Sequence, residues 1–206
     1  MKEMTRRSIA LGTGLAVLCA ALAAAEVPRK APELAIQFVN GQQLLLSQFR
    51  GKVVLLAFVH TTCPHCQQDS QLFERLSKEY GPRGFQPIDV AFNDNAAQLV
   101  PDFVRQLNLT FPVGFAGRDT VVDYLQLSYV KPYFVPQMVL IDRKGVIREQ
   151  HGGEDDFFKN LEPNLRTSIE GLLKEPASSA QRSRTTSGSA SAAKPKPVAK
   201  ATKPQS

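Results

Sequence analysis

The sequence has only three cysteines among its 206 residues, and it lacks the second cysteine pair that a structural zinc site usually requires. The net charge of +6 comes from the two ends of the chain. Three basic residues and one acidic residue precede residue 26, while six basic residues and no acidic ones follow residue 175. The segment 26–175 therefore has 16 basic and 18 acidic residues, and it nowhere interleaves aromatic residues with Lys and Arg. A nucleic-acid-binding surface is not expected.

The N-terminus lacks an apolar run long enough to span a membrane comfortably. Its basic residues precede a short apolar stretch and three small residues, namely Lys2, Arg6 and Arg7, then Ile9 to Leu22, then Ala23 to Ala25. This order is typical of a secretory signal peptide. We therefore expect residues 1–25 to be removed and the protein to be exported to the periplasm or cell envelope. A retained membrane anchor is the alternative.

Residues 176–206 lack branched aliphatic residues apart from Val198. A segment of Ala, Ser, Thr, Pro and Lys buries too little apolar surface to offset the entropy of ordering, so we expect a disordered basic tail. Its charges would allow a weak association with anionic polymers or lipid head groups of the envelope; the alternative is a solvated end without a partner. One domain, 26–175, remains, and it is long enough for a single core.

Both cysteines beyond the expected signal peptide lie in the motif Cys63-Pro64-His65-Cys66. The apolar run Val53–Val59 before it predicts a buried strand, and the polar segment Gln67–Tyr80 after it predicts an amphipathic helix. The two sulfurs would then lie at a helix N-terminus, where unpaired N–H groups and the helix dipole stabilise a thiolate. Pro64 suits the first turn, where its missing N–H costs nothing. The motif therefore predicts a dithiol/disulfide exchange site.

Strand and helix patterns alternate through the rest of the domain. Strands are predicted on both sides of Asn40-Gly41, over Phe85–Phe92 and Phe111–Phe115, and in a hairpin of Gln137–Ile141 and Val146–Glu149. Helices are predicted over Ala96–Leu107, Asp119–Leu127 and Asp155–Leu173, the last interrupted near Pro163. Alternating strands and helices indicate an α/β sandwich with a mixed sheet.

The chain resembles the thioredoxin superfamily, in particular the exported TlpA/ResA-like, or redoxin, thiol-disulfide oxidoreductases. Four segments carry the resemblance: Ala31-Pro32-Glu33-Leu34 with the Asn-Gly hairpin, Arg50-Gly51-Lys52-Val53-Val54-Leu55-Leu56, the Cys63 to Cys66 motif, and Val135-Pro136-Gln137-Met138-Val139-Leu140-Ile141-Asp142 followed by Gly145. The resemblance implies a thioredoxin-like three-layer sandwich. Its mixed central sheet would carry an N-terminal β-hairpin and helices on both faces.

The resemblance also implies a site for client proteins beside the cysteines. Pro136 would be a cis-proline lying against the motif, and the backbone of Val135 would pair with an extended peptide as an added strand. Phe134 would supply apolar contact. Thr62 replaces the tryptophan that usually precedes the first cysteine, and we expect it to contact the client as well.

Two features of the motif bear on the direction of the reaction. The Pro-His dipeptide resembles that of DsbA, an exported disulfide oxidant, and an imidazole at position 65 would favour the Cys63 thiolate. A stabilised thiolate makes the disulfide a stronger oxidant. Ala57 stands where cytosolic thioredoxins have a buried aspartate that assists proton transfer, so a fast thioredoxin-type reductase cycle is not expected. Oxidation, reduction and isomerisation all remain open.

We therefore expect a thiol-disulfide oxidoreductase whose redox-active group is the Cys63–Cys66 disulfide, with no cofactor and no metal. Cys63 would form the mixed disulfide and Cys66 would resolve it. The partners would be exported client proteins with thiols or disulfides, and an upstream redox partner.

Two other functions are compatible with the fold. A copper metallochaperone of the SCO type would use thiolates and imidazoles, and His60 and His65 lie close to the cysteines in sequence. SCO cysteines, however, are separated by three residues, and the only distant histidine here is His151. A peroxiredoxin-type peroxidase would need a proline and a Thr or Ser ahead of its cysteine, at the positions of Leu56 and His60, so hydroperoxide turnover is not expected.

Overall fold

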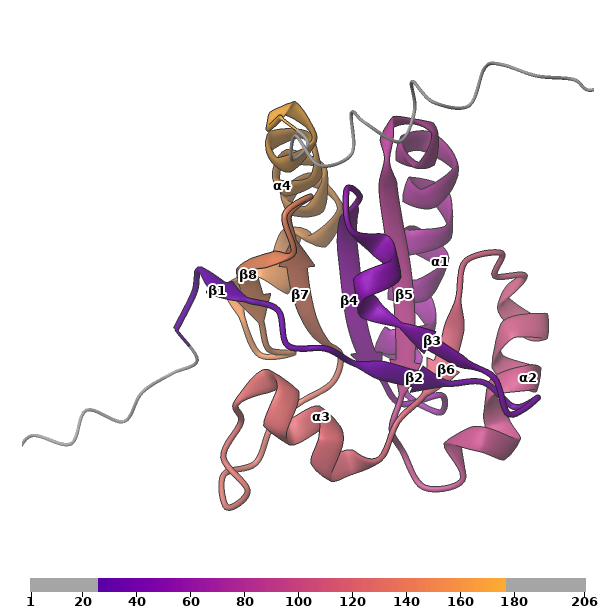
Figure 1. Ribbon diagram of the computed structural model, residues 1–206. Coiled ribbons are helices and arrows are strands. Elements are labelled where there is room, and N and C mark those ends of the chain that lie inside the picture. The colour runs from indigo at the N-terminus through magenta and orange to yellow at the C-terminus, as the bar shows by residue number, and fades with distance from the viewer. Residues whose placement is uncertain (1–25, 177–206) are drawn as a thin grey trace, which may run out of the picture.

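The computed structural model describes residues 26–176 (Figure 1). The expected signal peptide, 1–25, and all but the first residue of the expected tail lie outside this range. Eight strands form, namely β1 (Arg29–Lys30), β2 (Ala35–Gln37), β3 (Gln43–Leu45), β4 (Val53–Val59), β5 (Phe85–Ala91), β6 (Val113–Phe115), β7 (Gln137–Ile141) and β8 (Val146–His151). The α-helices are α1 (Pro64–Tyr80), α2 (Ala96–Leu107), α3 (Arg118–Leu125) and α4 (Leu161–Lys174).

All eight strands belong to one sheet with the order β1-β8-β7-β4-β5-β6-β2-β3. β4, β5 and β6 run parallel to one another, while β7 is antiparallel to β4 and β2 is antiparallel to β6. The sheet is therefore mixed. β4 lies at its centre, and all seven of its residues are buried. The cysteine motif follows directly from the end of this central strand.

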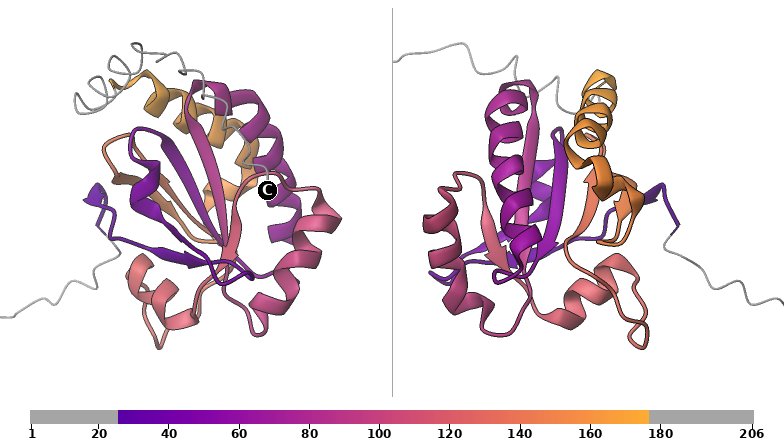
Figure 2. Two further views of the ribbon diagram at one scale, coloured as in Figure 1. Left: turned by 45° about the vertical axis from the view of Figure 1, so that its right-hand side comes forward. Right: turned by 180° about the vertical axis from the view of Figure 1, so that it is seen from behind.

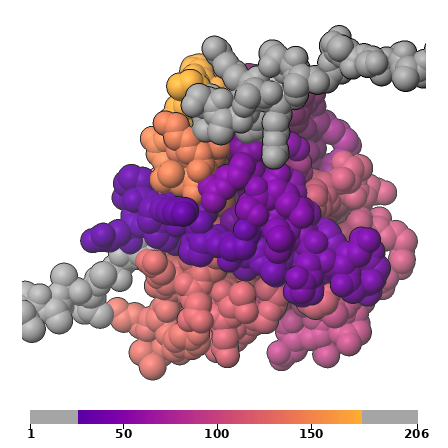
Figure 3. Space-filling model, in the orientation of Figure 1, coloured from indigo at the N-terminus to yellow at the C-terminus, as the bar shows by residue number. Residues whose placement is uncertain are grey.

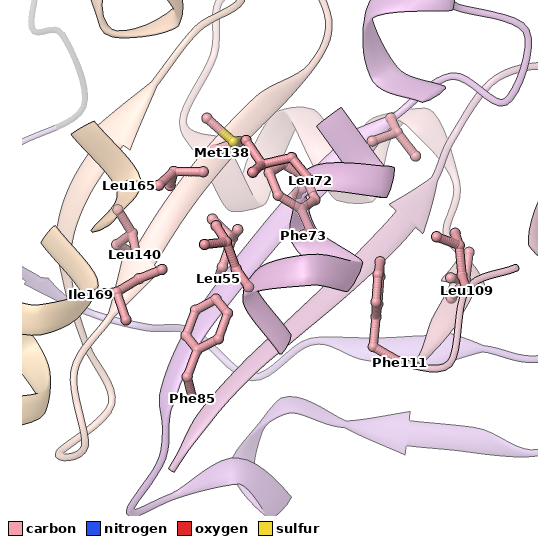
Figure 4. Packing of buried hydrophobic residues seen from close by; sticks show 14 of the residues in the cluster. Leu55, Leu72, Phe73, Phe85, Leu109, Phe111, Met138, Leu140, Leu165 and Ile169 are labelled. Atoms are coloured by element: carbon pink, nitrogen blue, oxygen red, sulfur yellow. The ribbon is translucent and has the colours of Figure 1, made fainter. Parts of the chain in front are cut away.

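Side chains alternate along β4, so it contributes to two separate cores. Val53, Leu55, Ala57 and Val59 belong to the core that α1, α2 and α4 cover, and part of that core is shown in Figure 4. Val54, Leu56 and Phe58 belong to the other, which residues of α3, β2 and the 3₁₀-helix Leu46–Phe49 complete. Seen from behind, α1 and α4 lie in front of the central strands (Figure 2). The predicted α/β sandwich with helices on both faces is confirmed.

The first described residues, which include β1, β2 and β3, lie across the front of the molecule (indigo in Figure 3). The predicted hairpin around Asn40-Gly41 is present as β2 and β3, with Ile36 paired to Leu44, and Gly41 adopts the left-handed conformation with φ +80°. β1 was not predicted. It pairs through Arg29 and Lys30 with β8, more than 110 residues later in the sequence.

The predicted interruption of the last helix near Pro163 is present. It lies between a 3₁₀-helix at Asp156–Asn160 and α4, which begins at Leu161. Pro163 lies in the first turn of α4, where a helix has no use for the missing N–H. Within residues 26–176, no helix has the length and apolar character needed to cross a membrane.

Candidate active site

Cys63 lies at the junction of β4 and α1. It is the N-cap residue of α1, with extended backbone angles of φ −82° and ψ 120°, and Pro64 is the first helical residue as predicted. The backbone N–H of Cys66 donates to the Cys63 sulfur at 3.4 Å. This N–H is one of those that a helix leaves unpaired at its N-terminus, so it is available to stabilise negative charge on that sulfur.

The turn before Cys63 is fixed by side chains from two other segments. Asn93 accepts hydrogen bonds from the backbone N–H of Thr61 at 2.9 Å and from its hydroxyl at 3.3 Å. Gln67 of α1 donates its side-chain amide to the Thr61 carbonyl at 2.8 Å. The backbone N–H of Cys63 donates to the His60 carbonyl at 3.0 Å. The first sulfur is therefore held by the ends of β4 and β5 together with α1.

The two cysteines are both thiols and differ in exposure. Cys63 is partly exposed, whereas Cys66 is fully buried in the core beneath α1. Burial raises the pKa of the Cys66 thiol far above its ordinary value, and the adjacent Cys63 adds to this effect. Cys66 is therefore a protonated thiol at neutral pH, and it needs a proton acceptor before it can attack a disulfide.

The Val135–Pro136 peptide bond is cis, as the resemblance implies. Both residues line a cavity of about 330 Å³ together with His65, Asp69, Gly153, Glu154, Asp155, Phe158 and Lys159. Upstream of the bond, the Phe134 carbonyl accepts from the Gln137 side chain at 2.6 Å and from the Gly153 N–H at 3.3 Å, which fixes the approach to Val135. Phe134 as a residue remains 60 % exposed.

Thr62 lies in a second cavity, of about 460 Å³, on whose walls His60, Phe92, Asn93, Asp94, Leu99, Arg118 and Tyr133 are also found. The Arg118 guanidinium lies 5.8 Å from the centre of the Tyr133 ring and donates to the Tyr133 hydroxyl at 3.1 Å. The structure thus places Thr62 and Val135 in different cavities.

Asp69 was not predicted as a site residue. It lies three residues after Cys66 in α1 and lines the same cavity as His65 and Pro136. Burial raises the pKa of Asp69 to about 6, and the positive charge of His65 partly opposes this rise. The spacing could have revealed it, since residues three apart on a helix are neighbours. A carboxyl that titrates near neutral pH beside a buried thiol is a candidate proton acceptor.

The three histidines occupy different settings. His65 is exposed in the first turn of α1, and its electrostatic partner is Asp69. The His60 ring packs edge-on against Phe92, and burial lowers its pKa against the opposing charge of Asp94. His151 stacks on Phe157 at 3.7 Å between ring centres. Within residues 26–176, no three His, Cys, Asp or Glu side chains are grouped so that they could hold a metal ion.

The profile of the AhpC/TSA family matches residues 27–150. The chain is 31 % identical over 146 residues to the thiol-disulfide oxidoreductase ResA of Halalkalibacterium halodurans, a match that covers 65 % of this chain and 78 % of the relative. It is 29 % identical over 126 residues to the thioredoxin-like protein YneN of Bacillus subtilis, covering 61 % of this chain and 71 % of the relative.

Solved structures share the fold. A protein from Chlorobium tepidum, assigned as a thiol:disulfide interchange protein DsbE, superposes with a TM-score of 0.59 at 27 % identity, covering 71 % of this chain and 96 % of the other. The thioredoxin domain of a thiol-disulfide oxidoreductase from Bacteroides vulgatus gives a TM-score of 0.57 at 21 % identity, with coverage of 75 % and 100 %. The predicted thioredoxin-like fold is confirmed.

Proposed function

We propose that this chain, which belongs to the AhpC/TSA family and is a TlpA/ResA-like member of the thioredoxin superfamily, exchanges its Cys63–Cys66 dithiol and disulfide with exported client proteins. The oxidoreductase activity is supported by the relatives. The use of the Cys63–Cys66 motif, the client proteins and the export are what we propose. The observation that carries it is the cysteine pair itself. One sulfur is partly exposed at a helix N-terminus, and the other is buried one turn behind it.

The reaction begins at Cys63. Its thiolate attacks a client disulfide and forms a mixed disulfide, while the client's other sulfur leaves as a thiolate. The Cys66 N–H at 3.4 Å and the end of the α1 dipole favour the anionic form of the attacking sulfur. Cys66 then attacks the Cys63 sulfur, which releases the reduced client and leaves the Cys63–Cys66 disulfide. With a dithiol client the same steps run in reverse. No cofactor is needed, since the two sulfurs carry both electrons.

Asp69 is the proposed proton acceptor for the second step. Cys66 is fully buried, so its proton needs an internal acceptor. Asp69 is three residues away on α1 and borders the cavity that leads to solvent. His65 would stabilise both the Cys63 thiolate and the Asp69 carboxylate.

The client would lie across Val135 and Pro136. An extended peptide there would pair with the Val135 backbone and contact the exposed Phe134. Its side chains would enter the two cavities. Thr62 and Tyr133 border one of these cavities, and Asp69 borders the other.

A trapping experiment tests this assignment. Cys66→Ser should accumulate mixed disulfides with exported proteins through Cys63, detected on non-reducing gels and mapped by mass spectrometry. Cys63→Ser is the matched control and should accumulate none. Adducts that form through position 66 in the control would reverse the roles of the two cysteines. The reduction potential of the wild-type pair against glutathione then gives the direction of the reaction: a strongly reducing value would favour a reductase over an oxidant.

Because redoxin domains include peroxiredoxins, peroxidase activity should be measured in the same preparation. Leu56 stands where a peroxidase would have its proline, and its fully buried side chain belongs to the opposite core from Cys66. His60 stands where a peroxidase would have its Thr or Ser, and its ring packs on Phe92 with 4.5 Å between the ring centres. We therefore expect hydrogen peroxide consumption to be slow beside disulfide exchange, and faster consumption would overturn the proposal.

A further inference from the structure

A second buried carboxyl lies near the cysteines and has no role in the mechanism above. Asp89 of β5 is 0 % exposed, and its backbone N–H donates to the Pro112 carbonyl at 3.1 Å. The hydroxyl of Ser70, also fully buried, donates to Asp89 Oδ2 at 2.6 Å. Asp89 Oδ1 has no hydrogen-bond partner anywhere in residues 26–176. A buried carboxyl with one oxygen unsatisfied is costly, so it calls for an explanation.

The fold places Asp89 close to the resolving cysteine. β5 pairs with β4 so that Asp89 stands opposite Ala57, whose side chain belongs to the same core as Cys66. Ser70 follows Cys66 by four residues, or about one turn of α1, so the two share a helix face. One hydrogen bond thus links β5 to the part of α1 that carries Cys66 and Asp69.

Few other charged groups surround Asp89. On α1 these are Asp69, whose negative charge raises the pKa of Asp89, and Glu74, which is tied to Thr110 and Lys78. β4 and β6 present Ala57 and Val113 as its partners. The charged residues of α2 are Asp102 and Arg105, an exposed pair 2.8 Å apart. Within residues 26–176, the ionisable group that acts on Asp89 from the cysteine side is therefore Asp69, which follows Cys66 by three residues on α1.

We propose that Asp89 is a positioning residue for thiol exchange, which through Ser70 and Asp69 sets the pH range in which Cys66 gives up its proton. This inference rests on the proposed function. The charge of Asp69 raises the pKa of Asp89, so the two carboxyls do not ionise independently. Burial raises the pKa of Asp89 to about 7, above that of Asp69. Between about pH 6 and pH 7 Asp89 is neutral and Asp69 alone is charged. Above about pH 7 both carboxyls are charged, and the Cys66 thiolate becomes a third negative charge in the same region.

The step that Asp89 would control takes place within the mixed disulfide. The Cys66 thiol passes its proton to the Asp69 carboxylate, and its sulfur bonds to the Cys63 sulfur as the bond from Cys63 to the client sulfur breaks. The client leaves as a thiolate and takes up the proton by way of Asp69 or solvent. The client disulfide has gained two electrons, and the Cys63–Cys66 pair has lost them.

The test uses the full chain and an aromatic disulfide dye that releases one coloured thiolate when Cys63 attacks and a second when Cys66 resolves. Asp89→Asn removes the charge but keeps an oxygen for the Ser70 hydroxyl. The ratio of the second-phase rate in this variant to that in the wild type should be near one at pH 5. It should rise to about tenfold at pH 8, because the wild type then carries the extra charge. The carboxyl carbon of Asp89, followed by NMR, should titrate at lower pH in Asp69→Asn than in the wild type, because the charge that raises the pKa of Asp89 is then absent.

Two further variants keep the test decisive. Ser70→Ala leaves the carboxyl in place but removes the bond that favours its ionised form, so the Asp89 carbon should titrate at higher pH. Asp142→Asn is the matched control, because Asp142 is another buried acid, bonded to Arg148 at the turn between β7 and β8. It should not change the titration of Asp89. A rate ratio equal at both pH values, or an unmoved Asp89 titration in Asp69→Asn, would overturn the inference. If the wild type releases no first thiolate at any pH, the proposed function itself fails.

Discussion

Replacing Asp89 by asparagine removes an ionisable group from the core while nearly keeping the shape of the side chain. The residue is fully buried between β4 and β6, and the Ser70 hydroxyl, 2.6 Å from Oδ2, can donate to the asparagine oxygen instead. The variant therefore isolates the energetic cost of ionising one buried carboxyl, and this cost appears in the stability of the protein whether or not the thiols react.

The sign follows from the direction of the pKa change. Burial raises the pKa of Asp89 from 3.8 to about 7, so between these pH values the folded protein retains a proton that the unfolded chain has lost. Because the folded state binds more protons, the free energy of unfolding of the wild type falls as the pH rises through this window. A difference of about 3 pH units corresponds to about 4 kcal/mol. Asparagine does not titrate, so the variant escapes this loss.

The order of stability of the wild type and the variant should therefore reverse between pH 4 and pH 8. At pH 4, Asp89→Asn should be the less stable by about 1–3 kcal/mol, since its amide is buried without a full set of partners. By pH 8 the difference should have moved by up to about 4 kcal/mol in favour of the variant. Urea unfolding at pH 4, 6 and 8, followed by circular dichroism with a reductant present, measures this. Asp69 titrates in both proteins and largely cancels. A difference that stays constant from pH 4 to pH 8 would refute the reasoning.

Three other substitutions test separate parts of the structure. Asp69→Asn removes the carboxyl whose pKa burial raises to about 6, so the rise of the second dye-release rate between about pH 5 and pH 7 should disappear. Gly114→Ala would place a Cβ 2.5 Å from Ile36 Cγ2 and should lower the free energy of unfolding in urea by about 1–3 kcal/mol. Burial acts to raise the pKa of Glu74, but hydrogen bonds from Thr110 hold it below its ordinary value. Glu74→Gln should therefore cost about 1 kcal/mol at pH 7, and this difference should vanish as acid protonates the wild-type carboxylate.

Local patterns were enough to predict the frame of the site. The apolar run Val53–Val59 is a strand as predicted, and α1 begins at Pro64 and ends before Gly81. These features depend on neighbouring residues: the strand on its composition, and the helix on its cap and its spacing of apolar side chains. The interruption near Pro163 depends on the proline itself, which is accommodated in the first turn of α4 and not in the interior of a helix.

The acidic half of the site could not be predicted in the same way, because it depends on strand register. Asp89 is an odd charge within an otherwise apolar strand, and the sequence alone does not say which residue it faces. The structure pairs it with Ala57, 32 positions earlier, and with Ser70 across the sheet–helix interface. A one-residue shift of β5 against β4 would turn this carboxyl toward the opposite core. Only the assembled sheet brings Asp89 and Cys66 to one face.

This register also bears on the absence of an acid in β4. The resemblance to thioredoxins predicts no fast thioredoxin-type reductase cycle, because Ala57 stands where thioredoxins have a buried aspartate. This prediction takes only β4 into account. Ala57 belongs to the sheet face beneath α1, and the next strand places a carboxyl at the same level, bonded to the helix that carries Cys66. Under the proposed mechanism, proton movement in this chain depends on Asp69 and Asp89 rather than on the β4 position. A loss of the pH dependence in Asp69→Asn with none in Asp89→Asn would assign it to the helix residue alone.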